Sequence, residues 1–150
     1  MDTDGKIKYP YAPYYGIRLL TQNWLLSNGS HELYPTAVTA ADGSRLTTVT
    51  AYAVRRPDGL WSVLFINKDP NRTYRTELRF RPTDRKLIQT TEAPLELFQY
   101  SSAQYMLNSD RSNPVPTKND PPVSTILNRE NADSIELPPY SLTVLRGRLK

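Results

Sequence analysis

The alternation of apolar and polar residues is clearest between residues 46 and 80. Three runs rich in β-branched and aromatic residues are separated there by turn residues, which is the pattern of successive β-strands. Pro57-Asp58-Gly59 supplies proline for the first corner of a hairpin turn and glycine where a positive φ is needed. The run from Trp61 to Ile66 is almost continuously apolar, so we expect a central strand that is covered on both faces. This stretch predicts a three-stranded antiparallel meander.

The end of the chain shows the same two-residue period. In the closing segment IELPPYSLTVLRGR (135–148), apolar and polar residues alternate after Pro138-Pro139. Because prolines have no N–H for a ladder hydrogen bond, they separate a short strand at 134–137 from a final strand at 140–146. Seven to nine short strands with turns at this spacing predict an all-β fold, an antiparallel two-sheet β-sandwich of jelly-roll type. Other segments are assigned as strands at 86–90, 95–100 and 103–107 and as a polar loop at 108–122.

The period changes near the N-terminus. Between Tyr14 and Ser27 the residues Ile17, Leu20 and Trp24 recur at spacings of three and four, which predicts one helix. Asn28-Gly29 supplies a left-handed C-cap. Apolar residues extend beyond that one face, which is more than a solitary helix on a small sheet needs. We therefore expect another domain to cover Ile17, Leu20 and Trp24.

Length and composition fit one globular domain. The chain has 150 residues, of which 38% are hydrophobic and 23% charged, so it is long enough to bury a sizeable core. We divide it into a linker (1–13), the helix (14–28) and the β-sandwich (29–150). No apolar run reaches the length of a membrane span, and cysteine is absent, which excludes disulfides and thiolate chemistry. No membrane partner is expected.

The positive charge of the chain is concentrated in one stretch. The net charge is +4, and RTYRTELRFRPTDRK (72–86) holds the densest group of arginines. Apolar and charged residues alternate there, so we interpret the stretch as a strand whose arginine-rich face is solvated and resists edge pairing. An anion-binding role is the less favoured reading. No nucleic-acid partner is expected.

Groups that could support catalysis or cofactor binding are sparse. His31 is the only histidine, and no cluster of Asp or Glu accompanies it at ligand spacing, so no metal site is predicted. The six glycines form no phosphate-binding loop, and no G-x-S-x-G nucleophile elbow occurs. We interpret His31 as a strand-end residue after the helix, with a Ser/His/Asp triad as a minor alternative. No cofactor is expected.

Aromatic residues are the remaining candidates for binding. A sugar ring stacks its apolar face on Trp or Tyr, and the chain has 10 Tyr and 2 Trp. The candidate carbohydrate-binding residues are Trp61, Tyr100 and Tyr105. Trp61 shares a strand face with Val63 and Phe65, which favours a position in the core. Tyr100 and Tyr105 flank the polar loop, and the sequence leaves both readings open.

Four segments together carry a resemblance to a known family. They are PYYGIRLLTQNW, LYPT, LTTVTAYAVRRPDGLWSVLFINKD and IELPPYSLTVLRGR. Over most of its length the chain resembles the C-terminal β-sandwich domain of retaining glycoside hydrolases built on a (β/α)8 barrel. The clan is that of α-L-arabinofuranosidases, β-xylosidases and β-glucuronidases. In these enzymes the last barrel helix runs into the sandwich, a central strand ends in an Asn-Lys-Asp-like turn, and the closing strand follows a Leu-Pro-Pro-Tyr-Ser-like segment.

The resemblance implies a non-catalytic accessory domain that stabilises a catalytic barrel. The clan's two catalytic carboxylates lie on the barrel, which needs about 250 residues, so no residue here inherits a catalytic role and the chain alone is not expected to be an enzyme. The helix 14–28 corresponds to the last helix of the barrel. In such enzymes the sandwich also draws a strand from before the barrel, and an extracellular or periplasmic location is favoured. The alternative is an autonomous carbohydrate-binding module whose exposed aromatic residues bind polysaccharide.

Overall fold

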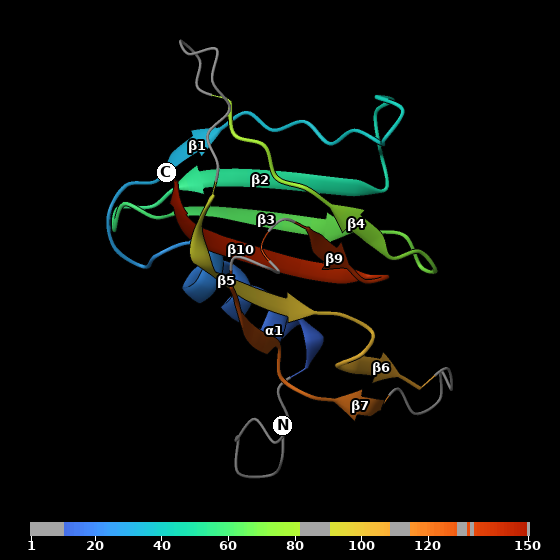
Figure 1. Ribbon diagram of the computed structural model, residues 1–150. Helices are drawn as coiled ribbons and strands as arrows, with labels where there is room; N and C mark the ends of the chain where they lie inside the picture. The colour runs from blue at the N-terminus through green and yellow to red at the C-terminus, as the bar shows by residue number, and fades with distance from the viewer. Residues whose placement is uncertain (1–10, 82–90, 109–114, 129–131, 133, 150) are drawn as a thin grey trace.

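The structure is a computed structural model that describes residues 11–81, 91–108, 115–128, 132 and 134–149. Within these residues the protein is an all-β, sandwich-like domain with one N-terminal helix (Figure 1), as the sequence predicts. The strand predicted at 86–90 lies outside the described residues. The helical elements and strands are α1 (Ala12–Arg18), η1 (Leu19–Trp24), β1 (Glu32–Tyr34), β2 (Val49–Arg55), β3 (Trp61–Asn67), β4 (Tyr74–Thr76), β5 (Thr91–Tyr100), β6 (Tyr105–Leu107), β7 (Pro116–Asn119), β8 (Val123–Leu127), β9 (Ile135–Leu137) and β10 (Ser141–Leu149).

The main sheet has six antiparallel strands in the order β1-β2-β3-β10-β5-β8. The hairpin between β2 and β3 is the predicted one, and Gly59 at its turn has a φ of 83°. The predicted three-strand meander is wrong, because the strand beside β3 is β10, paired from Ser141↔Asn67 to Gly147↔Trp61. The chain after β3 turns away from the sheet instead, and β4 pairs with β9 in a separate two-stranded sheet.

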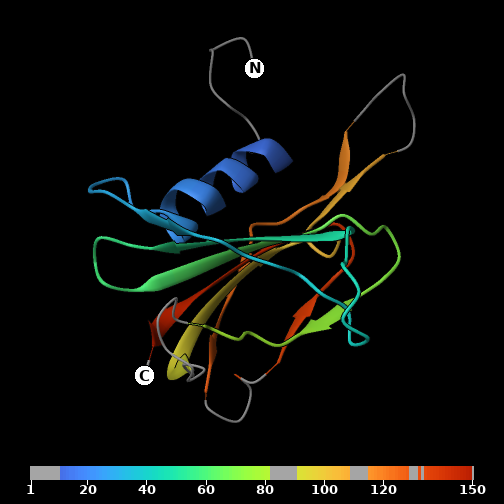
Figure 2. The ribbon, with the colours of Figure 1, turned by 90° about the horizontal axis from the view of Figure 1, so that it is seen from above.

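Two layers cover opposite faces of the main sheet, as Figure 2 shows from above. The helix lies on one face, where Tyr15 and Leu19 pack with Leu64, Tyr100 and Val144. On the other face the small β4–β9 sheet completes the larger core. The buried members of that core are Val49, Trp61, Val63, Phe65, Leu95, Ile135, Leu137 and Leu145.

Strand β3 is buried on both faces, as the apolar run predicts. Its odd-numbered residues Trp61, Val63 and Phe65 belong to the larger core, while Leu64 faces the helix. Six of its seven residues are buried. The helix and the small sheet both pack on apolar side chains of this strand, and its two polar residues, Ser62 and Asn67, are buried as well.

The helix is shorter than predicted and changes type along its length. After α1 it continues as the π-helical segment η1, and Leu25 N–H donates to Leu20 O at 2.9 Å as the helix ends. The predicted C-cap at Asn28-Gly29 therefore lies beyond the helix. Gly29 does have a positive φ of 89°, and a Cβ there would lie 2.7 Å from Pro57 Cβ. Glycine is required because this loop crosses closely over the β2–β3 turn.

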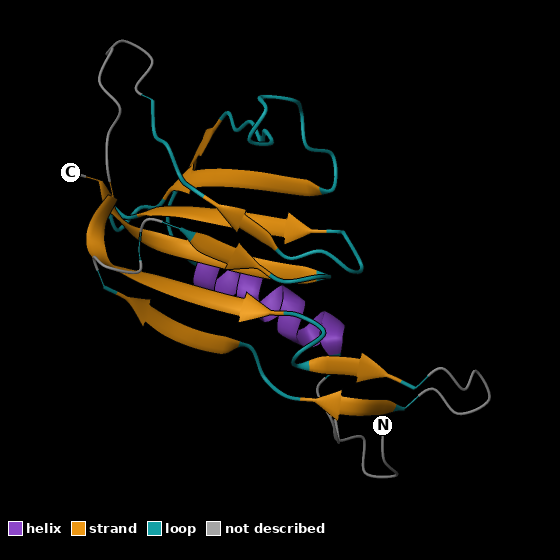
Figure 3. Ribbon diagram, turned by 45° about the vertical axis from the view of Figure 1, so that its right-hand side comes forward, coloured by secondary structure: helices purple, strands orange, loops and turns teal. Residues whose placement is uncertain are grey.

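Two strands lie where the sequence indicates no strand. The predicted loop 108–122 contains β7, which pairs with β6 in a hairpin that projects past the start of the helix (Figure 3). Strand β8 follows and forms one edge of the main sheet by pairing with β5. Both strands are short, and neither contains a fully buried residue, so their sequences lack a clear two-residue apolar period.

The side chain of Asn67 joins two distant segments of the sandwich. It is 2% exposed, and its Nδ2 donates to Arg72 O at 2.9 Å, Leu137 O at 3.0 Å and Pro138 O at 2.7 Å. Its Oδ1 accepts a hydrogen bond from Asp69 N–H at 3.0 Å. The Asn-Lys-Asp turn and the Leu-Pro-Pro segment, which carry much of the sequence resemblance, thus meet at one buried corner.

Candidate functional site

The outward face of the helix is apolar over its first half. Tyr11, Tyr14 and Ile17 follow one another at spacings of three residues, and they are 48%, 49% and 61% exposed. Tyr14 and Ile17 therefore share one face of the helix, and Tyr11 is the residue directly before its start. We call Tyr11, Tyr14 and Ile17 the helix ridge. A helix that packs only on its own sheet turns polar residues outward, so the ridge is a candidate interface.

The three interface residues named from sequence do not form one exposed patch. Ile17 is exposed, whereas Leu20 and Trp24 are partly buried against the core beneath the helix. The Trp24 ring lies edge-on to Tyr52, with 6.3 Å between ring centroids. Sequence reasoning missed Tyr11 and Tyr14, although their spacing of three from Ile17 is visible in the sequence.

Two arginines, one buried and one partly buried, bond the end of the helix. Arg56, whose side chain is 4% exposed, donates from Nη1 to Asn23 O at 2.8 Å and pairs through Nη2 with Asp58 Oδ2 at 2.8 Å. Arg146 donates to the same Asn23 carbonyl at 3.3 Å and forms an ion pair with Glu96. Cations favour the carbonyl end of a helix. These contacts fix where the helix ends and hence where the helix ridge points.

The carboxylates of this group titrate below their ordinary range. The hydrogen bond from Arg146, aided by the charge of that guanidinium, lowers the pKa of Glu96 against the opposing effect of burial. Burial alone would raise the pKa of Asp58. The hydrogen bonds from Arg56 and from the Leu60 N–H, together with the charge of Arg56, outweigh burial, so the pKa of Asp58 is also lowered. Both groups are therefore ionised and paired at neutral pH.

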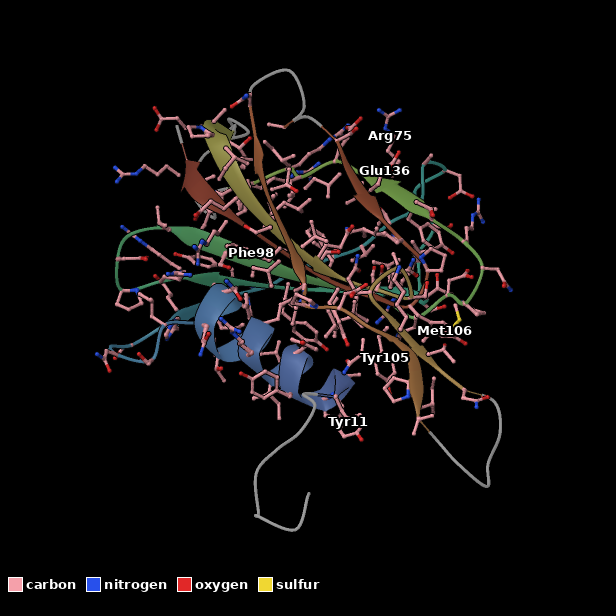
Figure 4. All side chains as sticks on the ribbon, turned by 90° about the horizontal axis from the view of Figure 1, so that it is seen from below. Tyr11, Arg75, Phe98, Tyr105, Met106 and Glu136 are labelled. Atoms are coloured by element: carbon pink, nitrogen blue, oxygen red, sulfur yellow. The ribbon has the colours of Figure 1, made fainter. Side chains whose placement is uncertain are left out.

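A surface hollow lies beside the start of the helix. It is lined by the rings of Tyr100, Tyr105 and Tyr140 together with Ala12, Ser102 and Leu142. We call it the tyrosine hollow. Figure 4 shows Tyr105 on the hairpin strand near Tyr11 at the helix start, with Met106 pointing outward. Two of the three residues proposed from sequence for carbohydrate binding, Tyr100 and Tyr105, thus meet at one place.

The three candidate aromatic residues differ in accessibility. Trp61 is 6% exposed and packs against Phe80 with ring centroids 4.8 Å apart, so its ring is not at the surface, in agreement with the favoured core position. Tyr100 is also 6% exposed and forms one wall of the hollow. Burial, together with the nearby Tyr105 and Tyr15, raises the pKa of Tyr100 to about 12. Tyr105 is partly exposed.

The histidine considered for a catalytic triad makes a contact with the backbone. His31 lies one residue before β1, and its Nε2 accepts a hydrogen bond from Leu26 N–H at 2.9 Å. No group of three or more His, Cys, Asp or Glu residues that could hold a metal ion occurs among the residues the structure describes. None of the helices in the described ranges is long and apolar enough to cross a membrane.

Within the basic stretch 72–86, the arginines that the structure describes are solvent-exposed, as predicted; they are Arg72, Arg75, Arg79 and Arg81, and we call them the arginine stripe. The strand is shorter than predicted and ends at Thr76. Arg75 donates from Nε to Ser134 Oγ at 2.8 Å, and Arg79 pairs with Glu77 at 3.1 Å. Figure 4 shows Arg75 beside Glu136, its partner in the β4–β9 register. These contacts are made within the stripe and its neighbouring strand.

Comparison with known proteins gives structural neighbours only. No protein-family model and no curated protein matches the chain. The chain is similar in structure to CelM2, a bifunctional glucanase-xylanase from a metagenome library, with a TM-score of 0.43 and 20% identity over 69% of this chain. It is also similar to the GH51 arabinofuranosidase from Xanthomonas axonopodis pv. citri, with a TM-score of 0.42 and 14% identity over 77% of this chain. The matches span only 16% and 21% of those two glycoside hydrolase chains.

Proposed function

We propose that the chain is a non-catalytic accessory β-sandwich domain of a glycoside hydrolase and that its helix side docks on the catalytic (β/α)8 barrel of the parent enzyme. The observation that carries this proposal is the helix ridge, where three large apolar side chains face outward from a helix whose other face is already packed. A contiguous exposed apolar surface of this kind is typical of a protein–protein contact.

The sequence resemblance supplies the identity of the partner. In the enzymes that the chain resembles, the last barrel helix runs directly into the sandwich, and the helix here enters the sandwich in the same order along the chain. The two resembling motifs also meet at Asn67, where one side chain bonds both. This contact gives the motifs a shared structural task, which supports an accessory rather than a catalytic role.

The open edge of the main sheet offers a second contact with the parent enzyme. Strand β8, with the sequence VSTIL, carries no charge and no proline, and four of its five residues are exposed. The opposite edge, β1, is only three residues long and begins with Glu32. Sheet edges are usually protected by shortness, charge or proline, so β8 is the edge at which a strand from before the barrel would pair.

The test is rescue of a barrel by this chain. A retaining (β/α)8 glycosidase barrel of the same clan, stripped of its own sandwich, is co-expressed with the chain. The proposal predicts that soluble, active barrel is recovered with the wild-type chain. Recovery is lost with Ile17→Lys, because burying a lysine in a closed apolar interface costs about 3 kcal/mol. Ile17 is 61% exposed, so this variant keeps its own fold.

A matched control separates the interface from general effects of charge. Tyr34→Lys places a lysine at another exposed apolar position, on β1 opposite Ala53, whose side chain packs in the core away from the helix. It should rescue as well as the wild-type chain does. Equal recovery with the wild type and with Ile17→Lys, or recovery with neither, would contradict docking through the helix ridge.

A further inference from the structure

We propose that the tyrosine hollow is a binding subsite for a neutral pyranose residue of an oligosaccharide. This proposal rests on the proposed function only for the class of ligand, because an accessory domain of a polysaccharide-degrading enzyme lies close to sugar polymers. The site differs from the helix ridge and needs no barrel to operate. Its wall residues come from the end of β5, the start of β6 and the turn before β10.

Tyr140 is the first observation behind this proposal. It has a φ of 46°, in the left-handed region, where bulky side chains are strained. Its backbone N–H donates to Asp69 O at 3.0 Å, which fixes the turn, yet its side chain is 62% exposed. Glycine or asparagine at this position would relieve the strain without loss of core packing. The benefit of the tyrosine ring must therefore come from contact with something outside the domain.

The second observation is that the hollow is held in shape before any ligand arrives. The Tyr100 ring is buried and packs against the Tyr15 ring of the helix, with centroids 5.5 Å apart. The Ser101 hydroxyl donates to Gln104 and accepts from the Ala103 N–H, which stiffens the turn between β5 and β6. A preformed site loses less conformational entropy when it binds a ligand, so more of the contact free energy appears as affinity.

The chemistry of the lining indicates the class of ligand. The tyrosine rings present apolar faces, and none of the residues that line the hollow is charged. A neutral pyranose matches this surface, because its C–H face stacks on an aromatic ring while its hydroxyls can bond the hydroxyls of the exposed residues Ser102 and Tyr140 at the rim. An acidic sugar would find no cation among the lining residues. An apolar side chain of the barrel is the competing occupant, but it would leave the rim hydroxyls without partners.

The test titrates the complete 150-residue chain with xylohexaose, cellohexaose and an oligosaccharide that carries glucuronic acid. Calorimetry and backbone amide NMR report binding. We expect millimolar binding of the neutral sugars, with shifts at Ser102, Tyr105 and Tyr140. Tyr140→Gly should weaken that binding by about tenfold or more, the loss typical of removing one contacting ring. The same variant should keep or raise the melting temperature, because glycine relieves the strained φ.

Control variants distinguish the outcomes. Tyr140→Phe keeps the ring and should keep most of the affinity, and Tyr34→Ala removes an exposed tyrosine 41% accessible on β1 and should change nothing. Tyr140→Asn replaces the glycine variant if the latter does not fold. The proposal is overturned if the folded chain binds none of the sugars or if Tyr140→Gly binds them as the wild type does. Loss of barrel rescue by Tyr140→Gly without sugar binding would identify the barrel as the occupant.

Failure here leaves the proposed function intact, and the converse also holds. Sugar titration uses the chain without a barrel, so it reports only on the tyrosine hollow. Barrel rescue uses Ile17→Lys, which lies on the helix ridge and lines no part of the hollow. A chain that binds sugar but rescues no barrel would be an autonomous binding module. A chain that rescues the barrel but binds no sugar would be an accessory domain that only stabilises the barrel.

Discussion

The buried amide of Asn67 allows the sharpest test of how the sandwich is held together. Asn67→Asp changes one NH2 group to an oxygen and keeps the size of the side chain. At neutral pH a carboxylate would then face the carbonyls of Arg72, Leu137 and Pro138, which accept from the amide in the native protein. The hydrogen bonds that the two N–H groups of the amide share among these three carbonyls are lost, and a buried charge lies among oxygens. We expect a loss of about 4 kcal/mol in the free energy of unfolding.

The assay is urea unfolding at several pH values. At pH 7 the expected loss of about 4 kcal/mol would also lower the melting temperature by roughly 12 °C in a domain of this size, which a thermal melt checks. Burial and the facing carbonyls raise the pKa of the introduced carboxyl, so the difference from wild type should shrink as the pH falls and the group becomes a neutral donor. Asn71→Asp, at an exposed position in the same turn, should change stability by less than about 0.5 kcal/mol. A loss that is equal in both variants, or independent of pH, would refute the reasoning.

Two further predictions concern packing and acid stability. Gly147→Ala should destabilise the fold by about 2 kcal/mol, because the new Cβ would lie 2.4 Å from Cδ2 of the fully buried Leu95. Chemical denaturation measures this loss. An unchanged unfolding free energy would show that Leu95 can move to make room for the new methyl group. The lowered pKa values of Glu96 and Asp58 add stability that is present above the ordinary carboxylate range, near pH ~4, and is lost as the pH falls through the folded values. Acid titration of the wild type and of Glu96→Gln checks this, since the variant should lose less stability between neutral and acid pH; an identical loss would contradict it.

The central strand and the hairpin before it could be predicted from the sequence because their determinants are local. An almost continuous apolar run predicts burial on both faces, and Pro57-Asp58-Gly59 predicts the turn. The alternation of Leu78 and Phe80 with exposed arginines likewise indicated which side chains join the core. In each case the residue pattern itself carries the information.

The order of the strands could not be predicted because it depends on distant contacts. The sequence neighbour of β3 is β4, but the Asp69 carboxylate accepts hydrogen bonds from Asn71 and Arg72 N–H and turns the chain away from the sheet. The place beside β3 is then filled by β10, whose register is seven residues long. Competition between a local hairpin and a longer distant pairing is not visible in a residue pattern.

The candidate site was only partly visible for the same reason. Tyr100 and Tyr105 were identified by type and position, but Tyr140 joins them only because its turn lies at the same end of the sheet. The helix was predicted to run to Ser27, yet it ends at Trp24, where Arg56 and Arg146 bond the Asn23 carbonyl. Both arginines are distant in sequence from the helix, since Arg56 directly follows β2 and Arg146 lies on β10. Of the helix ridge only Ile17 was identified from the sequence, although Tyr11 and Tyr14 precede it at spacings of three.

The measurement that tests the central claim most directly is hydrogen–deuterium exchange of the chain alone and bound to a catalytic barrel stripped of its own sandwich. The account predicts that amides of residues 11–24 and of β8 become protected on binding. Amides of β4 and β9, on the opposite layer, should exchange as before. Protection of β4 and β9 with no change along the helix would contradict docking through the helix side of the domain.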